Sequence, residues 1–155
     1  MKEQDRTLQN RQIMKHIEKG TFFINSEAET RALGLALAEA AEPGDIVALI
    51  GDLGTGKTAL TKYIAEGLGV KEEVISPTFT IVRAYRSGRL PLYHFDVYRL
   101  SDGMEFLDTG AEDYLEDSGL SVIEWADIVA DVLPPDALVV MIEYAEEGKR
   151  KVTIL

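Results

Sequence analysis

Residues 51–58 constrain the fold of this chain more than any other segment, because their spacing fits the pattern G-x-x-x-x-G-K-[ST] of a phosphate-binding loop. The segment reads Gly51-Asp52-Leu53-Gly54-Thr55-Gly56-Lys57-Thr58. An apolar run at residues 46–50 ends directly before it, and residues 58–66 follow with the apolar spacing of a helix. The pattern therefore predicts a loop that joins a buried strand to the N-terminus of a helix.

Three physical effects favour an anion at such a loop. Its glycines let successive backbone N–H groups point inward, the helix N-terminus carries a partial charge of roughly +0.5, and Lys57 adds a full positive charge. The hydroxyl of Thr58 is then left to hold a magnesium ion. We therefore predict that the loop binds a nucleotide, the alternative being a glycine-rich turn before an ordinary helix.

The length and composition suit one compact domain. The chain has 155 residues, of which 46% are apolar, and these suffice for a proper core. We expect a single domain over residues 21–155, preceded by an accessory helical extension over residues 1–20. No segment approaches the ~18 apolar residues needed to cross a bilayer, and no apolar signal core follows the N-terminus. We expect a cytoplasmic protein that contacts no membrane.

The charge of the chain is strongly negative and unevenly placed. The net charge is −11, and residues 101–147 contain 14 Asp or Glu and no Lys or Arg. Binding to nucleic acid depends on neutralising its phosphates with Lys and Arg, so a surface formed by this segment repels RNA. A partner would hold any RNA involved. The acidic stretch is either a solvated face or a docking surface for a basic partner.

The remaining patterns predict an α/β fold of the P-loop NTPase type, a sandwich with a mixed β-sheet flanked by helices. Ser26 and Glu29 have the spacing of a capping box that opens a helix through about Ala41. We expect strands at residues 21–25, 79–85, 90–96, 120–124, 137–144 and 150–155, with two short helices between residues 102 and 117. The strands at 79–85 and 90–96 form a hairpin, as do the last two.

Two strand-end acids are candidates for orienting magnesium or the attacking water. Glu124 ends the apolar run 120–123, and we expect it to bind the metal directly or through water. Asp96 ends the strand on whose face His94 also lies, and we expect a catalytic or metal-orienting role for it. A strand-end acid can instead cap a helix or pair with an arginine, here Arg99. A lone strand histidine such as His94 is more often a hydrogen-bonded part of the fold.

The segment Ser76-Pro77-Thr78 precedes the first hairpin, where a loop that closes on the terminal phosphate is a further candidate. Pro77 fixes its backbone, and Thr78 offers a hydroxyl. A plain turn entering a strand explains these residues equally well. Trp125 directly follows Glu124, and its ring is expected to pack at the core or rim, close enough to report nucleotide binding.

Four segments together resemble the TsaE (YjeE) family of bacterial ATPases, which is required for making threonylcarbamoyladenosine in tRNA. They are the loop at 51–58, Ser76-Pro77-Thr78-Phe79, Tyr93-His94-Phe95-Asp96-Val97-Tyr98-Arg99-Leu100 and Glu124-Trp125. The resemblance runs from about Phe22 to the C-terminus. It implies a small ATPase that binds the threonylcarbamoyl-transferase subunit and its non-catalytic paralogue, and meets tRNA only through them.

The resemblance also assigns roles by position. Thr58 and Glu124 match the family's magnesium residues, Lys57 its phosphate lysine and Asp96 its important acid. Glu27 and Gly148 match positions that approach the nucleotide, and residues 51–59 match its binding loop. The family often has a second threonine where this chain has Ala59, so one hydroxyl contact to the inner phosphate is missing.

Two other functions remain open from the residues. A small-molecule kinase shares the loop, the length and the fold, but residues 101–119 carry seven acids and no arginine for clamping a phosphorylated acceptor. A nucleotide-dependent assembly switch would need binding without turnover. No Asn-Lys-x-Asp segment exists to read guanine, which disfavours a GTPase.

Overall fold

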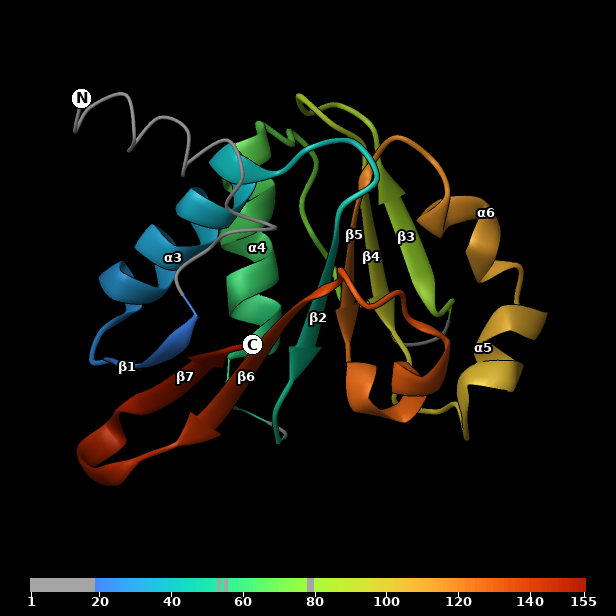
Figure 1. The fold of residues 1–155 in the computed structure, drawn as a ribbon. Coiled ribbons are helices and arrows are strands. Elements are labelled where there is room, and N and C mark those ends of the chain that lie inside the picture. The colour runs from blue at the N-terminus through green and yellow to red at the C-terminus, as the bar shows by residue number, and fades with distance from the viewer. Residues whose placement is uncertain (1–18, 53, 55, 78–79) are drawn as a thin grey trace, which may run out of the picture.

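The computed structural model describes residues 19–52, 54, 56–77 and 80–155. Its strands are β1 (Gly20–Ile24), β2 (Ile46–Ile50), β3 (Val82–Tyr85), β4 (Leu92–Asp96), β5 (Leu120–Glu124), β6 (Leu138–Tyr144) and β7 (Arg150–Ile154). They form one sheet in the order β1-β7-β6-β2-β5-β4-β3 (Figure 1). The expected extension over residues 1–20 falls outside the described residues except for Lys19 and Gly20, and so do Leu53, Thr55 and Thr78.

Parallel strands form the middle of the sheet and antiparallel strands flank them. Strands β6, β2, β5 and β4 run parallel, whereas β3, β7 and β1 pair antiparallel with their neighbours. Both predicted hairpins are present, because β3 pairs with β4 and β6 pairs with β7. The carboxyl ends of β2, β4 and β5 therefore meet at one edge of the sheet, where the loop at residues 51–56 begins.

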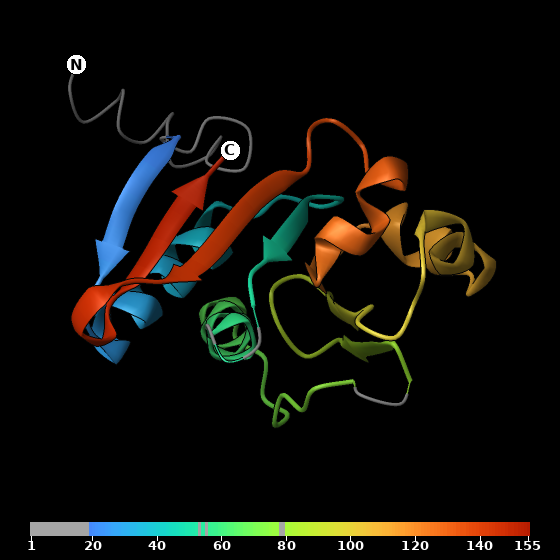
Figure 2. The ribbon, with the colours of Figure 1, turned by 90° about the horizontal axis from the view of Figure 1, so that it is seen from below.

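Helices cover both faces of the sheet, which confirms the predicted α/β sandwich. One face packs against α3 (Glu27–Ala40) and α4 (Lys57–Leu68), with Leu37, Leu60 and Val122 in a shared core. The other face packs against α5 (Gly103–Asp108), α6 (Ala111–Leu115) and the 3-10 helix η1 (Ala126–Val132) through a second core that includes Phe95 and Phe106. Figure 2 shows β1 and β7 at one end of the molecule and α5 and α6 at the other.

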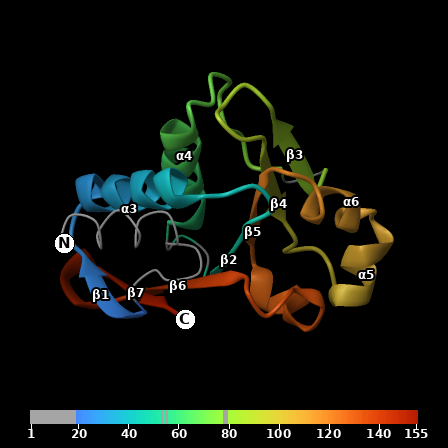
Figure 3. The same cartoon turned by 45° about the horizontal axis from the view of Figure 1, so that its top comes forward.

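The helix that follows the loop is held firmly by its neighbour. A Cβ on Gly34 of α3 would lie 2.5 Å from the Cβ of Tyr63 on α4, and a Cβ on Gly67 would lie 2.5 Å from that of Ala38. Any side chain at either glycine would force the helices apart, so both glycines are needed for this close packing. Figure 3 shows α3 beside α4 over the sheet. The N-terminus of α4 is thereby placed at the edge where β2 ends.

Helices α3 and α5 begin at residues whose side chains cap them. Ser26 caps α3, because its hydroxyl accepts a hydrogen bond from the N–H of Glu29 at 3.2 Å. Glu29 in turn accepts from the N–H of Asn25 at 2.9 Å, one residue earlier than in a standard capping box. Helix η1 was not predicted, and Val129 inside it has a non-helical φ of −116°, so it lacks the regular period that sequence patterns detect. Among the described helices, none has both the length and the apolar character needed to cross a bilayer.

Candidate nucleotide-binding site

The predicted loop joins β2 to α4 as expected and is shaped by glycines. Gly54 has a φ of 81° and Gly56 a φ of 108°, backbone conformations that side chains rarely adopt. A Cβ on Gly54 would lie 2.5 Å from the Tyr144 hydroxyl, so a side chain there would displace the exposed tyrosine ring. Gly56 is the N-cap of α4 and offers no side-chain oxygen to the first N–H groups of the helix. The helix N-terminus thus suits an external anion.

Lys57 lies over the loop and is only 5% exposed. Its ammonium donates hydrogen bonds to the backbone carbonyls of Gly51 and Asp52, the second at 3.1 Å. It also lies 3.9 Å from the centroid of the Trp125 ring, within range of a cation–π interaction. Burial lowers the pKa of Lys57, and the charge of Glu124 opposes that shift. A bound phosphate would place negative charge beside this desolvated ammonium.

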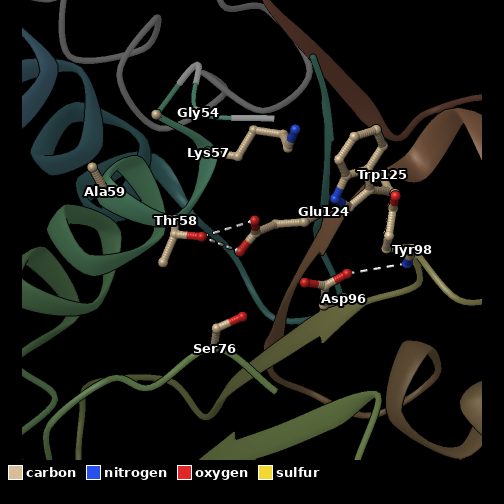
Figure 4. A pocket seen from close by; sticks show the side chains of 10 residues that line it. Gly54, Lys57, Thr58, Ala59, Ser76, Asp96, Tyr98, Glu124 and Trp125 are labelled. Carbon is tan, nitrogen blue, oxygen red and sulfur yellow. Dashed lines mark hydrogen bonds between the residues drawn. The ribbon is translucent and has the colours of Figure 1, made fainter. Parts of the chain in front are cut away.

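Thr58 and Glu124 meet across the cavity, as the sequence predicted (Figure 4). The Thr58 hydroxyl donates to Glu124 Oε1 at 3.0 Å, with Oε2 at 3.3 Å. Glu124 ends β5 opposite Leu49 of β2, so the strand pairing carries its carboxylate to the start of the loop. Two oxygen ligands from the protein, completed by phosphate oxygens and water, suit Mg²⁺ bound with a nucleotide. The donor set therefore fits the expected metal.

Asp96 lies beside Glu124 because β4 and β5 are parallel neighbours in which these two residues are opposite each other. Its carboxylate accepts a hydrogen bond from the backbone N–H of Tyr98 at 3.0 Å, which fixes the turn after β4. The same side chain lines the cavity. Asp96 thus caps the turn after its own strand, and not a helix as considered from the sequence, and it also faces the candidate site.

His94 is fully buried and contacts Glu124 rather than the cavity. Its Nε2 lies 2.5 Å from Glu124 Oε2. The other ring nitrogen, Nδ1, has no hydrogen-bond partner in the part of the chain that the structure describes. Leaving a buried polar atom unpaired costs about 1–3 kcal/mol. The expected structural hydrogen bond exists, but the sequence did not reveal that its partner is the candidate metal ligand.

Two aromatic rings close the cavity beside Lys57. Trp125 has a φ of 64°, which is uncommon for a bulky residue and turns the chain sharply after Glu124. This turn lets consecutive side chains reach the same cavity. The ring of Tyr98 lies 4.7 Å from that of Trp125 at an angle of 48°. Tyr98 was not predicted as a site residue, and only its place two residues after Asp96 could have indicated it.

The cavity has a volume of about 430 Å³, and most of the predicted site residues that the structure describes line it. It is lined by Gly54, Gly56, Lys57, Thr58, Ala59, Ser76, Asp96, Tyr98, Glu124 and Trp125. Gly51 and Asp52 take part through their carbonyls on Lys57. Ser76 reaches the cavity, while the carbonyl of its neighbour Pro77 accepts from the N–H of Ile81 at 3.2 Å. Leu53, Thr55 and Thr78 lie outside the described residues.

Glu27 and Gly148 do not line this cavity but an adjacent one of about 340 Å³. The two cavities share Gly56 and Ala59, so the second lies on the other side of the start of α4. Glu27 is oriented by the Tyr63 hydroxyl, which donates to its carboxylate at 2.7 Å. The hydrogen bond to Glu27 raises the pKa of Tyr63, and burial of the Tyr63 hydroxyl raises it to a smaller extent.

A glycine-rich loop between a parallel strand and a helix, with an acid at the end of the neighbouring strand, defines an α/β protein of the P-loop NTPase type. Comparison with known proteins narrows this class. Residues 24–152 match the family model described as threonylcarbamoyl adenosine biosynthesis protein TsaE. The chain belongs to the TsaE family.

Individual relatives agree with this family. The tRNA threonylcarbamoyladenosine biosynthesis protein TsaE of Bacillus subtilis (strain 168) is 45% identical over 130 residues, which cover 84% of this chain and 80% of that protein. The protein of the same name from Treponema pallidum (strain Nichols) is 40% identical, over 83% of this chain and 95% of its own. The crystal structure of YdiB from Bacillus subtilis superposes with a TM-score of 0.76 at 37% identity, covering 88% of this chain and 84% of that one.

Proposed function

We propose that this chain is a Mg²⁺-dependent ATPase that supports threonylcarbamoyladenosine modification of tRNA as a subunit of a threonylcarbamoyl-transferase complex. Membership of the TsaE family supports the pathway. The observation that carries the proposed chemistry is the meeting of Lys57, Thr58 and Glu124 at one cavity above the loop. These three side chains supply a cation and two oxygen ligands where the phosphates and the metal of a nucleotide would lie.

Different residues would bind different parts of the metal-bound nucleotide. The backbone N–H groups at the start of α4 and the ammonium of Lys57 would hold the outer phosphates. Thr58 and Glu124 would hold Mg²⁺, which neutralises charge on the phosphates when it is bound. Asp96 faces the same cavity and is our candidate for orienting the attacking water. Glu27 and Gly148 would approach the nucleoside from the adjacent cavity.

Nucleotide binding requires Lys57 to change partners. In this structure its ammonium is engaged by the carbonyls of Gly51 and Asp52. Phosphate oxygens carry full negative charge, so they attract the ammonium more strongly than the dipoles of neutral carbonyls do. The incoming phosphate would therefore displace the loop carbonyls. Trp125 lies against the same ammonium, so the exchange should alter the surroundings of its ring.

The charge distribution supports contact with tRNA through partners. Exposed acids lie on α5, α6 and η1, among them Asp102, Glu105, Glu112 and Asp127. Such a surface does not favour RNA phosphates. We propose that the threonylcarbamoyl-transferase subunit and its non-catalytic paralogue bind the tRNA and this chain supplies ATP turnover to them. We expect this to take place in the cytoplasm, where tRNA is modified.

The two alternatives have weaker support. A small-molecule kinase needs basic residues that clamp its acceptor, and residues 101–119, which form α5 and α6, contain none. A non-hydrolytic assembly switch would use the same loop and metal ligands. Such a switch differs from the ATPase only because it does not hydrolyse the bound ATP. The position of Asp96 beside Glu124 favours hydrolysis, because Asp96 is the candidate for orienting the attacking water.

The test is phosphate release from ATP by the purified chain, alone and with the two partner subunits. The ATPase proposal predicts low release alone, a several-fold rise with the partners, and loss of both in Lys57→Ala. ATP binding without release under any condition would favour the assembly switch. Phosphate transfer to a small molecule in place of release would favour the kinase.

A further inference from the structure

His94 reaches the Glu124 carboxylate from the interior of the sheet, beneath the proposed metal site. Asp96 lies opposite Glu124 in the pairing of β4 with β5, so His94, two residues earlier, is diagonal to Glu124 on the same face. The His94 side chain is fully buried, and Glu124 is 3% exposed. The His94 side chain cannot turn into solvent without opening the core.

The histidine contacts one oxygen of this carboxylate, Oε2, whereas the threonine hydroxyl lies within 3.3 Å of both. Thr58 Oγ1 lies nearer to Oε1, at 3.0 Å, whereas His94 Nε2 contacts Oε2 at 2.5 Å. An ionised carboxylate only accepts hydrogen bonds, so Nε2 is the donor. Oε2 is thereby held by His94 from the sheet interior, whereas Oε1 has no contact with the histidine and lies nearer to Thr58. Within the described residues, Glu124 is the only hydrogen-bond partner of the His94 ring.

Metal ions differ in how they use a carboxylate. Ca²⁺ takes about 6–8 oxygen ligands and often binds both oxygens of one carboxylate. Mg²⁺ prefers an octahedral set and uses single carboxylate oxygens together with water and phosphate oxygens. A carboxylate with one oxygen already engaged therefore suits Mg²⁺ better than Ca²⁺.

We propose that His94 is a positioning residue that leaves only one oxygen of Glu124 for the metal and so makes the site prefer Mg²⁺ to Ca²⁺. The inference rests on the proposed function, because it requires a metal-bound nucleotide at Thr58 and Glu124. A purely structural role for His94 would affect folding stability but would leave the relative affinity for the two metal complexes unchanged.

The test compares ATP affinity in Mg²⁺ and in Ca²⁺ through the fluorescence of Trp125, the only tryptophan in the chain. We expect the parent protein to bind ATP about tenfold more tightly with Mg²⁺, a difference of about 1.4 kcal/mol. His94→Gln should keep this preference, because its amide N–H reaches about as far as Nε2. His94→Asn carries the same group but is too short to reach Oε2, and its preference should fall to about twofold or less.

A second loss variant separates metal preference from folding. His94→Leu removes the contact without burying an unpaired amide, and it should lose the preference as His94→Asn does. Thermal unfolding of each variant shows whether it is folded. The inference would be overturned if His94→Asn and His94→Leu showed the same metal preference as the parent protein. It would also be overturned if His94→Gln lost the preference to the same extent as His94→Asn. If neither loss variant folds, a parent preference below about twofold overturns it.

The failure of the proposed function looks different. A parent protein that binds ATP with neither metal would overturn the proposed function and, with it, the inference. A parent protein that binds ATP well with both metals, with the affinity lost in Lys57→Ala, would keep the nucleotide site and overturn only the role of His94.

Discussion

The two cavities beside the start of α4 are built in different ways. The larger one is lined by Lys57 and Glu124, which are 5% and 3% exposed and are held by neighbouring side chains and carbonyls. The adjacent one depends on Glu27 and Gly148, which lie on the exposed surface. Among the residues that the structure describes, only Gly56 and Ala59 belong to both.

This difference indicates where affinity for a nucleotide should reside. Buried groups that already point into a cavity bind without much loss of side-chain freedom, whereas exposed groups must first be ordered. We therefore expect the phosphates and metal to supply most of the binding free energy, and the nucleoside to supply little.

The largest effect should come from Lys57→Ala. It removes the one buried cation at the phosphate cavity among the described residues, and we expect ATP affinity to fall about 100-fold because hydrogen bonds to charged groups each contribute about 1.5–3 kcal/mol. Calorimetric titration with Mg²⁺-ATP measures the loss. Lys62→Ala, on the exposed face of the same helix, is the matched control and should bind like the parent. Similar affinity in both variants would contradict the assignment.

A smaller effect, an increase in ATP affinity, is expected from Ala59→Thr. Ala59 lines both cavities, and a hydroxyl there would add one hydrogen bond for the inner phosphate, raising ATP affinity about fivefold. Ala59→Val has nearly the same shape without the hydroxyl and should show no gain. The two variants are compared by equilibrium binding at fixed Mg²⁺. A gain in the valine protein would mean that packing, and not the hydroxyl, controls affinity at this position.

The smallest effect should come from the exposed cavity. Glu27→Ala removes a side chain whose only ordering contact in the described chain is the Tyr63 hydroxyl, and we expect ATP affinity to fall about threefold. Glu39→Ala, on the exposed surface of the same helix, controls for the change of charge. A loss as large as that of Lys57→Ala would remove the contrast between the two cavities.

The sequence could predict the loop, its flanking elements and the meeting of Thr58 with Glu124. Local residues specify these features: glycines require the turn, and parallel buried strands must bring their carboxyl ends to one edge. Asp96 could be recognised as a strand-end acid by the same reasoning, but its place beside Glu124 depends on the pairing of β4 with β5. The hairpins and the caps of α3 follow from equally short patterns.

Other features depend on register and backbone conformation, which short patterns do not contain. The contact of His94 with Glu124 requires the exact alignment of β4 against β5. The position of Trp125 over Lys57 requires a φ of 64° at a bulky residue, which local preference opposes. Glu27 lines the adjacent cavity and not the phosphate cavity, because α3 packs against α4. Each of these is set by tertiary contacts between distant segments.

The central claim is that Thr58 and Glu124 hold the metal of a bound nucleotide. The most direct measurement is a Mg²⁺ titration of ATP binding, followed by Trp125 fluorescence, in the parent and in Glu124→Gln, with Glu143→Gln on β6 as the control. The account predicts that Glu124→Gln needs about tenfold more Mg²⁺ for the same binding, while its affinity for ATP without metal is unchanged or higher. Identical Mg²⁺ dependence in all three proteins would contradict it.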